Sequence, residues 1–352
     1  MDHDSWGVHR RGDRYARHML TIASSGIARA TLPVVAFGCL DATVVVLWQE
    51  LADLGVLPFS LPNFGDSPFA LSGFVLSLLL VFRTDSGYAR YSEAIKAWET
   101  LLGLCRDLTR QSMLFVGKEM GDEKRAVECA RLVKALPASL LGMLRGWNLE
   151  RLRQVLVQAG LTPAEAEVVS RADHPAQFVV EALCELILDS GVDKQTKLLL
   201  EGNLTVVSEQ FAACERILKT PVPIFYSHHI SRFVTIWLAL LPLGLYRTLG
   251  WEVIPAMAVI VFTLVGIDEI GLTIEEPFGV LPLETITTTI WRNVDNSVAR
   301  GLRGGPSALK QIQTADPDGA STAYRASDCT EGLAKCFAGE DDASQTARAL
   351  EL

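Results

Sequence analysis

The sequence predicts an all-α integral membrane protein with a long helical region outside the membrane. The mean hydropathy is +0.25 although 21% of the residues are charged, which indicates a chain that is partly embedded in a membrane and partly exposed to water. Four apolar stretches interrupt a chain rich in helical periodicity. No stretch shows the sustained alternation of a β-strand, and there is no repeat and no glycine-rich nucleotide loop.

The four apolar stretches predict four transmembrane helices per subunit. They lie at about residues 27–51, 68–82, 233–246 and 253–267. Only the first reaches the roughly 20 residues of a simple span. The length of the other three favours buried helices, but each lies next to amphipathic sequence that can extend it into a spanning helix.

The second apolar stretch predicts a helix that leaves the membrane without a break. Residues 69–82 carry no charge, charges recur from Arg83 onward, and no proline interrupts residues 69–99. From Tyr88, apolar side chains repeat with the helical period, and charges fill the other face. We expect a membrane helix that continues into a cytosolic stalk, followed by further helices through residue 228.

The distribution of charge predicts the orientation. The arginines that precede the first span are Arg10, Arg11, Arg14, Arg17 and Arg29. The loop over residues 52–67 contains no Lys or Arg, whereas residues 83–228 are rich in both. The positive-inside rule therefore places both termini and the central helices on the cytoplasmic or stromal side.

The overall composition argues against several other classes of protein. A net charge of −9 does not fit a nucleic-acid binder. The seven cysteines form no C-x-x-C pair, and we interpret them as buried reduced thiols rather than a disulfide framework or a zinc site. The N-terminal residues lack the apolar segment of a signal peptide.

One face of the second span is a candidate functional surface. Leu71, Val75, Leu78 and Phe82 follow one another at helical spacing. One interpretation is that this face packs against a neighbouring helix, helped by the small residues nearby. The other is that copies of the helix surround a symmetry axis and form a narrow hydrophobic neck.

Polar residues near the membrane ends are further candidates. Arg83 either extends its charge to the water interface and forms surface ion pairs, or places charge at the cytoplasmic mouth of a pore. His228 and His229 are adjacent, so they point to different faces of a helix and make a poor metal pair. An acidic patch follows the fourth span and consists of Asp268, Glu269, Glu275 and Glu276. It could attract a cation but lacks the spacing of an EF-hand.

Three motifs together resemble the signature of bestrophin-type channels. The segment "FVLSLLLVFRTDSGYARYSEAIKAWE" is similar to the family's second membrane helix, "ACERILKTPVPIFYSHH" to the entry of the third, and "GIDEIGLTIEEPFG" to the exit of the fourth. They occur in the family's order and spacing, and the resemblance covers roughly residues 5–300. The pattern looks most like the bacterial and plant or algal branch, including the thylakoid chloride channels.

This resemblance implies a homopentamer of four-span subunits around one axial pore that is lined by the second helix. It implies passive conduction of anions, chiefly chloride, with bicarbonate and nitrate as further candidates. The neck would be formed by Leu71, Val75, Leu78 and Phe82, and a cytosolic aperture is expected near Leu204. Such a channel is not an enzyme, so we expect no catalytic residue, no metal and no cofactor, and the partners are the lipid bilayer and other copies of the chain.

The resemblance also sets limits for the domains and an expectation for calcium. We expect a channel domain over residues 1–300, with cytosolic helices at 83–228 and 268–300, and a polar, disordered tail over residues 301–352. In animal bestrophins an acidic run after "PFG" ligates activating calcium. Here "VLPLE" follows and supplies only Glu284, so direct gating by calcium is not expected.

Alternatives remain for both the function and the membrane. A monovalent cation channel of the same fold is favoured by the acidic balance of the chain. A membrane-embedded metal enzyme would use His228 or His229 with Asp268 and Glu269. The thylakoid membrane is the expected location, and a bacterial inner membrane is the alternative.

Overall fold

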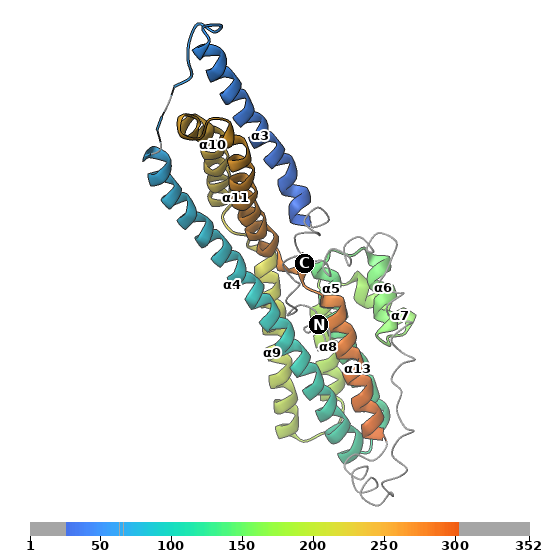
Figure 1. Cartoon of the computed structure of the whole chain (residues 1–352). Helices are drawn as coiled ribbons and strands as arrows, with labels where there is room; N and C mark the ends of the chain where they lie inside the picture. The colour runs from blue at the N-terminus through green and yellow to red at the C-terminus, as the bar shows by residue number, and fades with distance from the viewer. Residues whose placement is uncertain (1–25, 63, 66, 303–352) are drawn as a thin grey trace, which may run out of the picture. The chain divides into compact units, whose positions relative to one another are not determined.

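The protein is described by a computed structural model over residues 26–302, except residues 63 and 66, and all the regular structure in these residues is helical (Figure 1). In chain order the elements are α3 (Gly26–Asp53), α4 (Ser67–Gln111), the π-helix η2 (Ser112–Glu119), α5 (Glu123–Leu144), α6 (Leu149–Gln158), α7 (Pro163–Arg171), α8 (Pro175–Leu188), α9 (Lys194–Lys219), α10 (Ile224–Leu249), the 3₁₀ turn η3 (Gly250–Glu252), α11 (Val253–Glu275), α12 (Pro277–Val280) and α13 (Leu283–Leu302). The predicted all-α class is confirmed for this part of the chain. The expected tail over residues 301–352 lies almost wholly outside the described residues.

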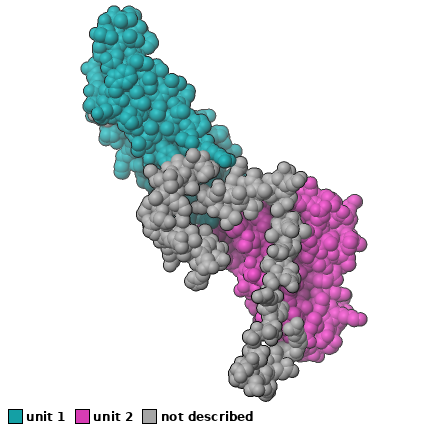
Figure 2. Space-filling model, turned by 45° about the vertical axis from the view of Figure 1, so that its right-hand side comes forward, with its two compact units in different colours: residues 1–91, 221–276, 344–352 teal, residues 92–220, 277–343 magenta. Residues whose placement is uncertain are grey.

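The described chain forms two compact units, which Figure 2 draws in teal and magenta. The first, here called the membrane unit, contains residues 26–91 and 221–276. The second, here called the helical unit, contains residues 92–220 and 277–302. Helix α4 continues through the boundary between Tyr91 and Ser92. The predicted single helix from apolar into charged sequence is therefore confirmed.

The membrane unit contains the apolar helices. Within the described residues, three helical stretches are long and apolar enough to cross a membrane: Ile27–Asp53, Ser67–Glu119 and Ile224–Glu275. The third consists of α10 and α11, which the short turn η3 separates. All four apolar stretches found in the sequence lie inside helices, and α10 and α11 are longer than their apolar parts because helical polar sequence extends them.

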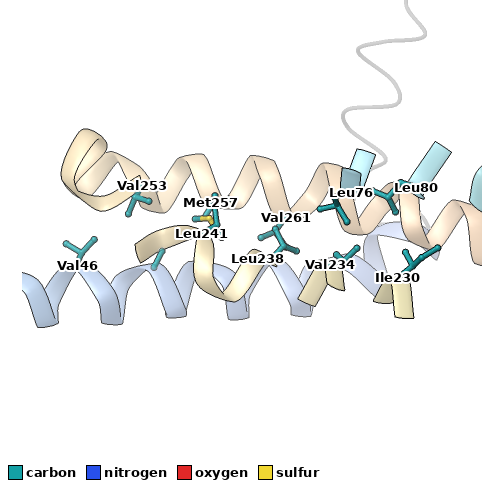
Figure 3. Close-up of a cluster of buried hydrophobic side chains, with 11 residues drawn as sticks. Val46, Leu76, Leu80, Ile230, Val234, Leu238, Leu241, Val253, Met257 and Val261 are labelled. Atoms are coloured by element: carbon teal, nitrogen blue, oxygen red, sulfur yellow. The ribbon is translucent and has the colours of Figure 1, made fainter. Parts of the chain in front are cut away.

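A cluster of apolar side chains holds the membrane unit together (Figure 3). Helix α3 contributes Ala42 and Val46, α4 contributes Leu76 and Leu80, and the remaining side chains come from α10 and α11. Helices α3 and α11 approach closely at Gly38, where an added Cβ would lie 2.8 Å from Val261 Cγ2. Only 22% of each apolar window is buried inside the chain. Most of the apolar surface of these helices is therefore left for lipid or for another protein surface.

The helical unit has a core of its own, built around α5. Helix α5 packs against α8, η2 and α13, and the Trp291 indole of α13 donates a hydrogen bond of 2.8 Å to the Lys134 carbonyl of α5. The predicted apolar stripe of the stalk contributes Trp98, Cys105 and Leu108, which are all fully buried. The helices of this unit are capped by side chains, as in the reciprocal box formed by Thr162 and Glu165 at the start of α7.

Candidate functional site

The first part of α4 has one face on the core of the membrane unit and one face that the chain leaves uncovered. Leu76 and Leu80 belong to the buried cluster. On the other side, the exposed fractions of the predicted neck residues are 76% for Leu71, 49% for Val75, 43% for Leu78 and 55% for Phe82. The structure therefore brings the four predicted residues together on one uncovered, uncharged surface, as a pore lining or a subunit contact requires.

The uncovered surface is wider than the predicted stripe. Phe74 and Val81 are 72% and 59% exposed, and Ser77 lies between them on the same side. At about 100° per residue, the exposed positions from Ala70 to Phe82 span about 160° of the helix circumference. Phe74 and Val81 were not singled out from the sequence, although they have the same apolar character and helical spacing. Phe74 and Val81 form a second exposed stripe beside that of Leu71, Val75, Leu78 and Phe82. Substitutions in the second stripe can therefore serve as controls for substitutions in the first.

The rotation of α4 about its axis is fixed by contacts with α10. The Trp237 indole donates a hydrogen bond of 3.0 Å to the Ser72 hydroxyl. Phe69 packs edge-on against the Trp237 ring with centroids 6.1 Å apart. An added Cβ on Gly73 would lie 3.4 Å from the same indole. Because Ser72 and Gly73 face α10, Leu71 and Val75 are directed away from it.

An ion pair marks the point where α4 changes from apolar to charged sequence. The Arg83 guanidinium donates a hydrogen bond to the Asp268 carboxylate of α11, and only 5% of the Arg83 side chain is exposed. Its Nε has no hydrogen-bond partner in the described part of the chain. The sequence suggested either surface ion pairs or a charged pore mouth for Arg83, and within this chain the charge is paired but buried. The role at a pore mouth stays a prediction.

Two further contacts follow the ion pair along α4 and α11. At Gly87, an added Cβ would lie 2.8 Å from Ile274 Cγ1 and 3.1 Å from the Gly271 carbonyl oxygen. One turn later, Arg90 Nε donates a hydrogen bond of 3.0 Å to the Glu275 carbonyl. The two helices are therefore held in one register where they leave the apolar region, and this register sets the height of the predicted neck residues along α11.

The predicted aperture residue lies on α9 in the helical unit. Leu204 is 1% exposed, whereas Leu198 and Leu199 on the same helix are 63% and 48% exposed. Leu204 forms part of the wall of a hollow of about 570 Å³ between α8 and α9. Glu181 and Glu201 also line this hollow. Leu204 is thus a core residue within one chain, and its role at an aperture stays a prediction.

The remaining candidates are spread over the surface of the membrane unit. His228 and His229 are both exposed in the first turns of α10. Of the acidic patch, Asp268 pairs with Arg83, while Glu276 is exposed at the end of α11. No group of three or more His, Cys, Asp or Glu side chains suited to a metal occurs among the described residues. The structure therefore adds no support to the metal-enzyme alternative.

The turn after the "PFG" sequence is held by an arginine. Arg145, at the end of α5, donates hydrogen bonds of 3.2 Å to the carbonyl oxygens of Gly279 and Leu281. It also donates one of 3.2 Å to the Glu284 carboxylate, and its side chain is only 18% exposed. The sequence did not predict this contact, because Arg145 lies more than a hundred residues away from the turn.

Comparison with known proteins decides the family. The family model described as "Bacterial/Fungal Bestrophin protein" matches residues 6–296, which is most of the chain and includes the whole membrane unit from residue 26 onward. The chain belongs to this bestrophin family. The resemblance found in the three sequence motifs is thereby confirmed.

Relatives of this bestrophin occur in plants and bacteria. It is 31% identical over 300 residues to "Voltage-dependent chloride channel 1, chloroplastic" of Arabidopsis thaliana, an alignment that covers 84% of this chain and 72% of that protein. It is 30% identical over 291 residues to a "Voltage-dependent anion channel-forming protein" of Mesorhizobium japonicum, covering 81% and 89% of the two chains. Both are channel proteins by name, and the apolar helices of this bestrophin are those of a membrane protein.

The fold of this bestrophin also matches solved structures. A crystal structure of a bacterial bestrophin homolog from Klebsiella pneumoniae superposes with a TM-score of 0.67 at 24% identity, covering 75% of this chain and 97% of that one. At this identity the match shows the fold alone. The helical architecture described above is therefore the bestrophin fold, and the roles of single residues have to be argued from the geometry of this chain.

Proposed function

We propose that this bestrophin is an anion channel that conducts chloride passively through a pore lined by α4. The observation that carries the proposal is the uncovered, uncharged face of α4, on which Leu71, Val75, Leu78 and Phe82 lie in line. The relatives from Arabidopsis and Mesorhizobium, named as a chloride channel and an anion channel-forming protein, support the same activity. Bicarbonate and nitrate are further candidate ions.

The proposed assembly is a homopentamer whose subunits each cross the membrane four times, through α3, α4, α10 and α11. A ring of identical chains places the same face of α4 at the axis in every copy. The neck would then be a ring of apolar side chains, which gates by dewetting or by small side-chain movements. Ions are held only weakly, by helix dipoles and backbone amides, and no residue performs covalent chemistry.

A second constriction is proposed on α9 in the helical unit, near Leu204. Because Leu204 is buried, the large apolar side chains that a pore could reach on this helix without repacking are those that are exposed, Leu198, Leu199 and Leu218. Arg83 is proposed to act at the pore mouth through the ion pair that it forms with Asp268, by fixing α4 rather than by presenting a free charge.

The channel is proposed to work without direct calcium gating. The turn after "PFG" offers two backbone carbonyls and one carboxylate, which are the oxygen ligands that calcium prefers. In this chain the Arg145 guanidinium already bonds to these oxygens of Gly279, Leu281 and Glu284. A bound calcium ion would have to displace a partly buried positive charge from this turn.

For the membrane, we propose the thylakoid, which the chloroplastic relative supports. A bacterial inner membrane is the second candidate, supported by the Mesorhizobium relative at nearly the same identity. Fractionation of the source cells and detection of the chain with an antibody tests this part of the proposal. Enrichment in any other membrane contradicts both candidates.

The first experiment is the reversal potential of the purified protein in a planar bilayer under a KCl gradient. A reversal potential near that of chloride is expected. A reversal near the potassium potential would instead identify the cation channel of the same fold, which the net charge of −9 favours. Absence of current from protein that remains folded and assembled would overturn the channel proposal.

A further inference from the structure

Asp41 is an acidic residue near the middle of the first apolar helix. At 1.5 Å per residue it lies about 22 Å from Gly26 and about 18 Å from Asp53 along α3. The hydrocarbon core of a bilayer is about 30 Å thick, so Asp41 falls near its centre when α3 crosses the membrane. Between Arg29 and Glu50, no other Asp, Glu, Lys or Arg occurs in the sequence.

The side chain of Asp41 is half-buried, and one of its oxygens has no partner among the residues that the structure describes. Its Oδ2 is fully buried and accepts no hydrogen bond from any described residue. The next residue, Ala42, is completely buried in the cluster of the membrane unit, and Val45 is 6% exposed. The carboxyl group therefore points one of its oxygens into an apolar environment.

The elements that pack against α3 at this height are apolar. Helix α3 packs against α10, α11 and η3. Two contacts next to Asp41 show which part of α11 lies beside it. Gly38 faces Val261, and the Cys39 thiol lies 3.9 Å from the Ile254 carbonyl oxygen. The first ionisable side chains along these elements are Arg232 and Tyr246 on α10, Glu252 on η3 and Asp268 on α11, together with Arg29, Cys39 and Glu50 on α3. None of them forms a hydrogen bond or ion pair with Asp41 in the described residues.

A carboxylate at the centre of a membrane without a cation is costly, and such a group becomes neutral by binding a proton. We propose that Asp41 is a proton-binding site of the membrane unit. Its carboxyl is a neutral acid at neutral pH, and loss of the proton weakens the packing of α3 on α10 and α11. The inference rests on the position of Asp41 along α3 and on the apolar packing around it, so it holds or fails independently of the ion that the channel conducts.

Infrared spectroscopy tests the protonation state directly. The full chain is placed in phosphatidylcholine vesicles at neutral pH, and the spectrum of Asp41→Asn is subtracted from that of the unchanged protein. The expected difference is one carbonyl band of a protonated carboxyl, which shifts in D₂O. Asp53→Asn, at the exposed end of the same helix, is the matched control and should leave that band in place. If Asp41 is ionised, for instance by pairing with a cation of a neighbouring copy, the band is missing and the proposal is overturned.

A chemical probe locates the acid independently. Dicyclohexylcarbodiimide enters membranes and reacts with protonated carboxyls. The acid proton moves to a carbodiimide nitrogen, the carboxyl oxygen bonds to the central carbon, and an acyl shift leaves a stable N-acylurea. Peptide mass spectrometry should find this adduct on Asp41 and not on Asp53, with a yield that falls as the pH is raised. An adduct on Asp53 at equal or higher yield would contradict selective protonation at Asp41.

Discussion

Glu215 on α9 is the residue at which pH should most clearly alter the stability of the helical unit. It bonds to His174 Nε2 and accepts a hydrogen bond of 2.7 Å from Lys219 Nζ. His174 in turn caps α8, because its Nδ1 accepts a hydrogen bond of 3.2 Å from the Gln177 backbone. Burial opposes ionisation of Glu215, but the bonds from Lys219 and His174 outweigh it and lower the pKa of this carboxyl.

The lowered pKa predicts a stability that is lost in acid. The contribution of Glu215 is fully present above the pKa of an unfolded glutamate, about 4.3, and disappears as the pH falls through the lower folded pKa. Glu215→Gln should therefore cost about 1 kcal/mol at neutral pH and nothing in strong acid, as measured by thermal unfolding at several pH values. Glu209→Gln, on the exposed side of α9, should cost little at any pH. A difference for Glu215→Gln that persists in acid would contradict this account.

Arg145 is the residue that should decide the response to calcium. Replacing it by Gln removes three charge-assisted hydrogen bonds to the turn after "PFG" and should destabilise the protein by about 1–3 kcal/mol. Arg171→Gln, which breaks only an exposed pair with Glu167, should stay within about 0.5 kcal/mol. Currents of the unchanged channel should be the same with calcium and with a chelator. A calcium-dependent current would show that Arg145 does not take the place of the ion.

At the scale of the residue, the sequence is least informative about which side chains form long-range contacts. Arg83 and Asp268 are 185 positions apart, and nothing in either neighbourhood distinguishes this partner from the other acids in the last turns of α11. The sequence did indicate that each lies at the end of an apolar stretch. Their contact depends on the register of α4 against α11, which is set by tertiary packing.

At the scale of the element, α4 was the most predictable part of the chain. Its apolar half and its amphipathic half each carry the helical period, and no proline or glycine pair breaks the junction, so the continuous helix Ser67–Gln111 followed from local sequence. The π-helix Ser112–Glu119 that succeeds it did not. Its sequence is ordinary, and the wider turn accommodates packing against α5 and α13, which local periodicity does not encode.

The two exposed stripes of α4 make the neck testable. Leu71→Ala and Val75→Ala should widen an apolar neck and raise the single-channel conductance in planar bilayers. Phe74→Ala and Val81→Ala alter side chains that are equally exposed but lie on the other stripe, and should change the conductance less. If the second pair has the larger effect, the pore faces Phe74 and Val81. Unchanged conductance and rectification in all four variants would exclude α4 as the pore lining.

The contact between α4 and α11 predicts opposite effects for two glycines of α4. Gly87→Ala places a Cβ 2.8 Å from Ile274 and 3.1 Å from the Gly271 carbonyl oxygen, which belongs to a helix backbone that cannot easily move. It should destabilise the protein by about 1–3 kcal/mol. Gly103→Ala meets nothing within 4 Å and should stabilise it by about 0.5–1 kcal/mol. Thermal unfolding in detergent measures both changes, and equal effects would mean that α4 and α11 are not in close contact.

At the scale of the whole molecule, a single chain leaves most of the apolar surface of its membrane unit uncovered. Its apolar windows are only 22% buried internally, and the exposed face of α4 carries Leu71, Phe74 and Phe82 beside one another. Lipid can cover such a surface. If lipid covered the face of α4 that is proposed to line the pore, however, no path would remain for ions. The proposed pore therefore requires several copies of α4 around an axis, and identical chains can achieve this by a closed ring of head-to-tail contacts.

The ring predicts one assembly size. Native mass spectrometry of the detergent-solubilised protein should give a single species at five times the chain mass of 38.4 kDa. Dilution should not produce smaller species, because the interfaces of the proposed pentamer would be formed by apolar surface, as in obligate assemblies. Leu71→Ala should keep this mass, since a side chain that faces the axis contributes little to the contact between neighbours. Phe74→Ala and Val81→Ala should weaken the assembly if the second stripe of α4 meets the adjacent chain. A species of two or four chains would contradict the pentamer. If only Leu71→Ala dissociates the assembly, the assignment of the two stripes is reversed: Leu71 would lie in the contact between chains, and Phe74 and Val81 would face the pore.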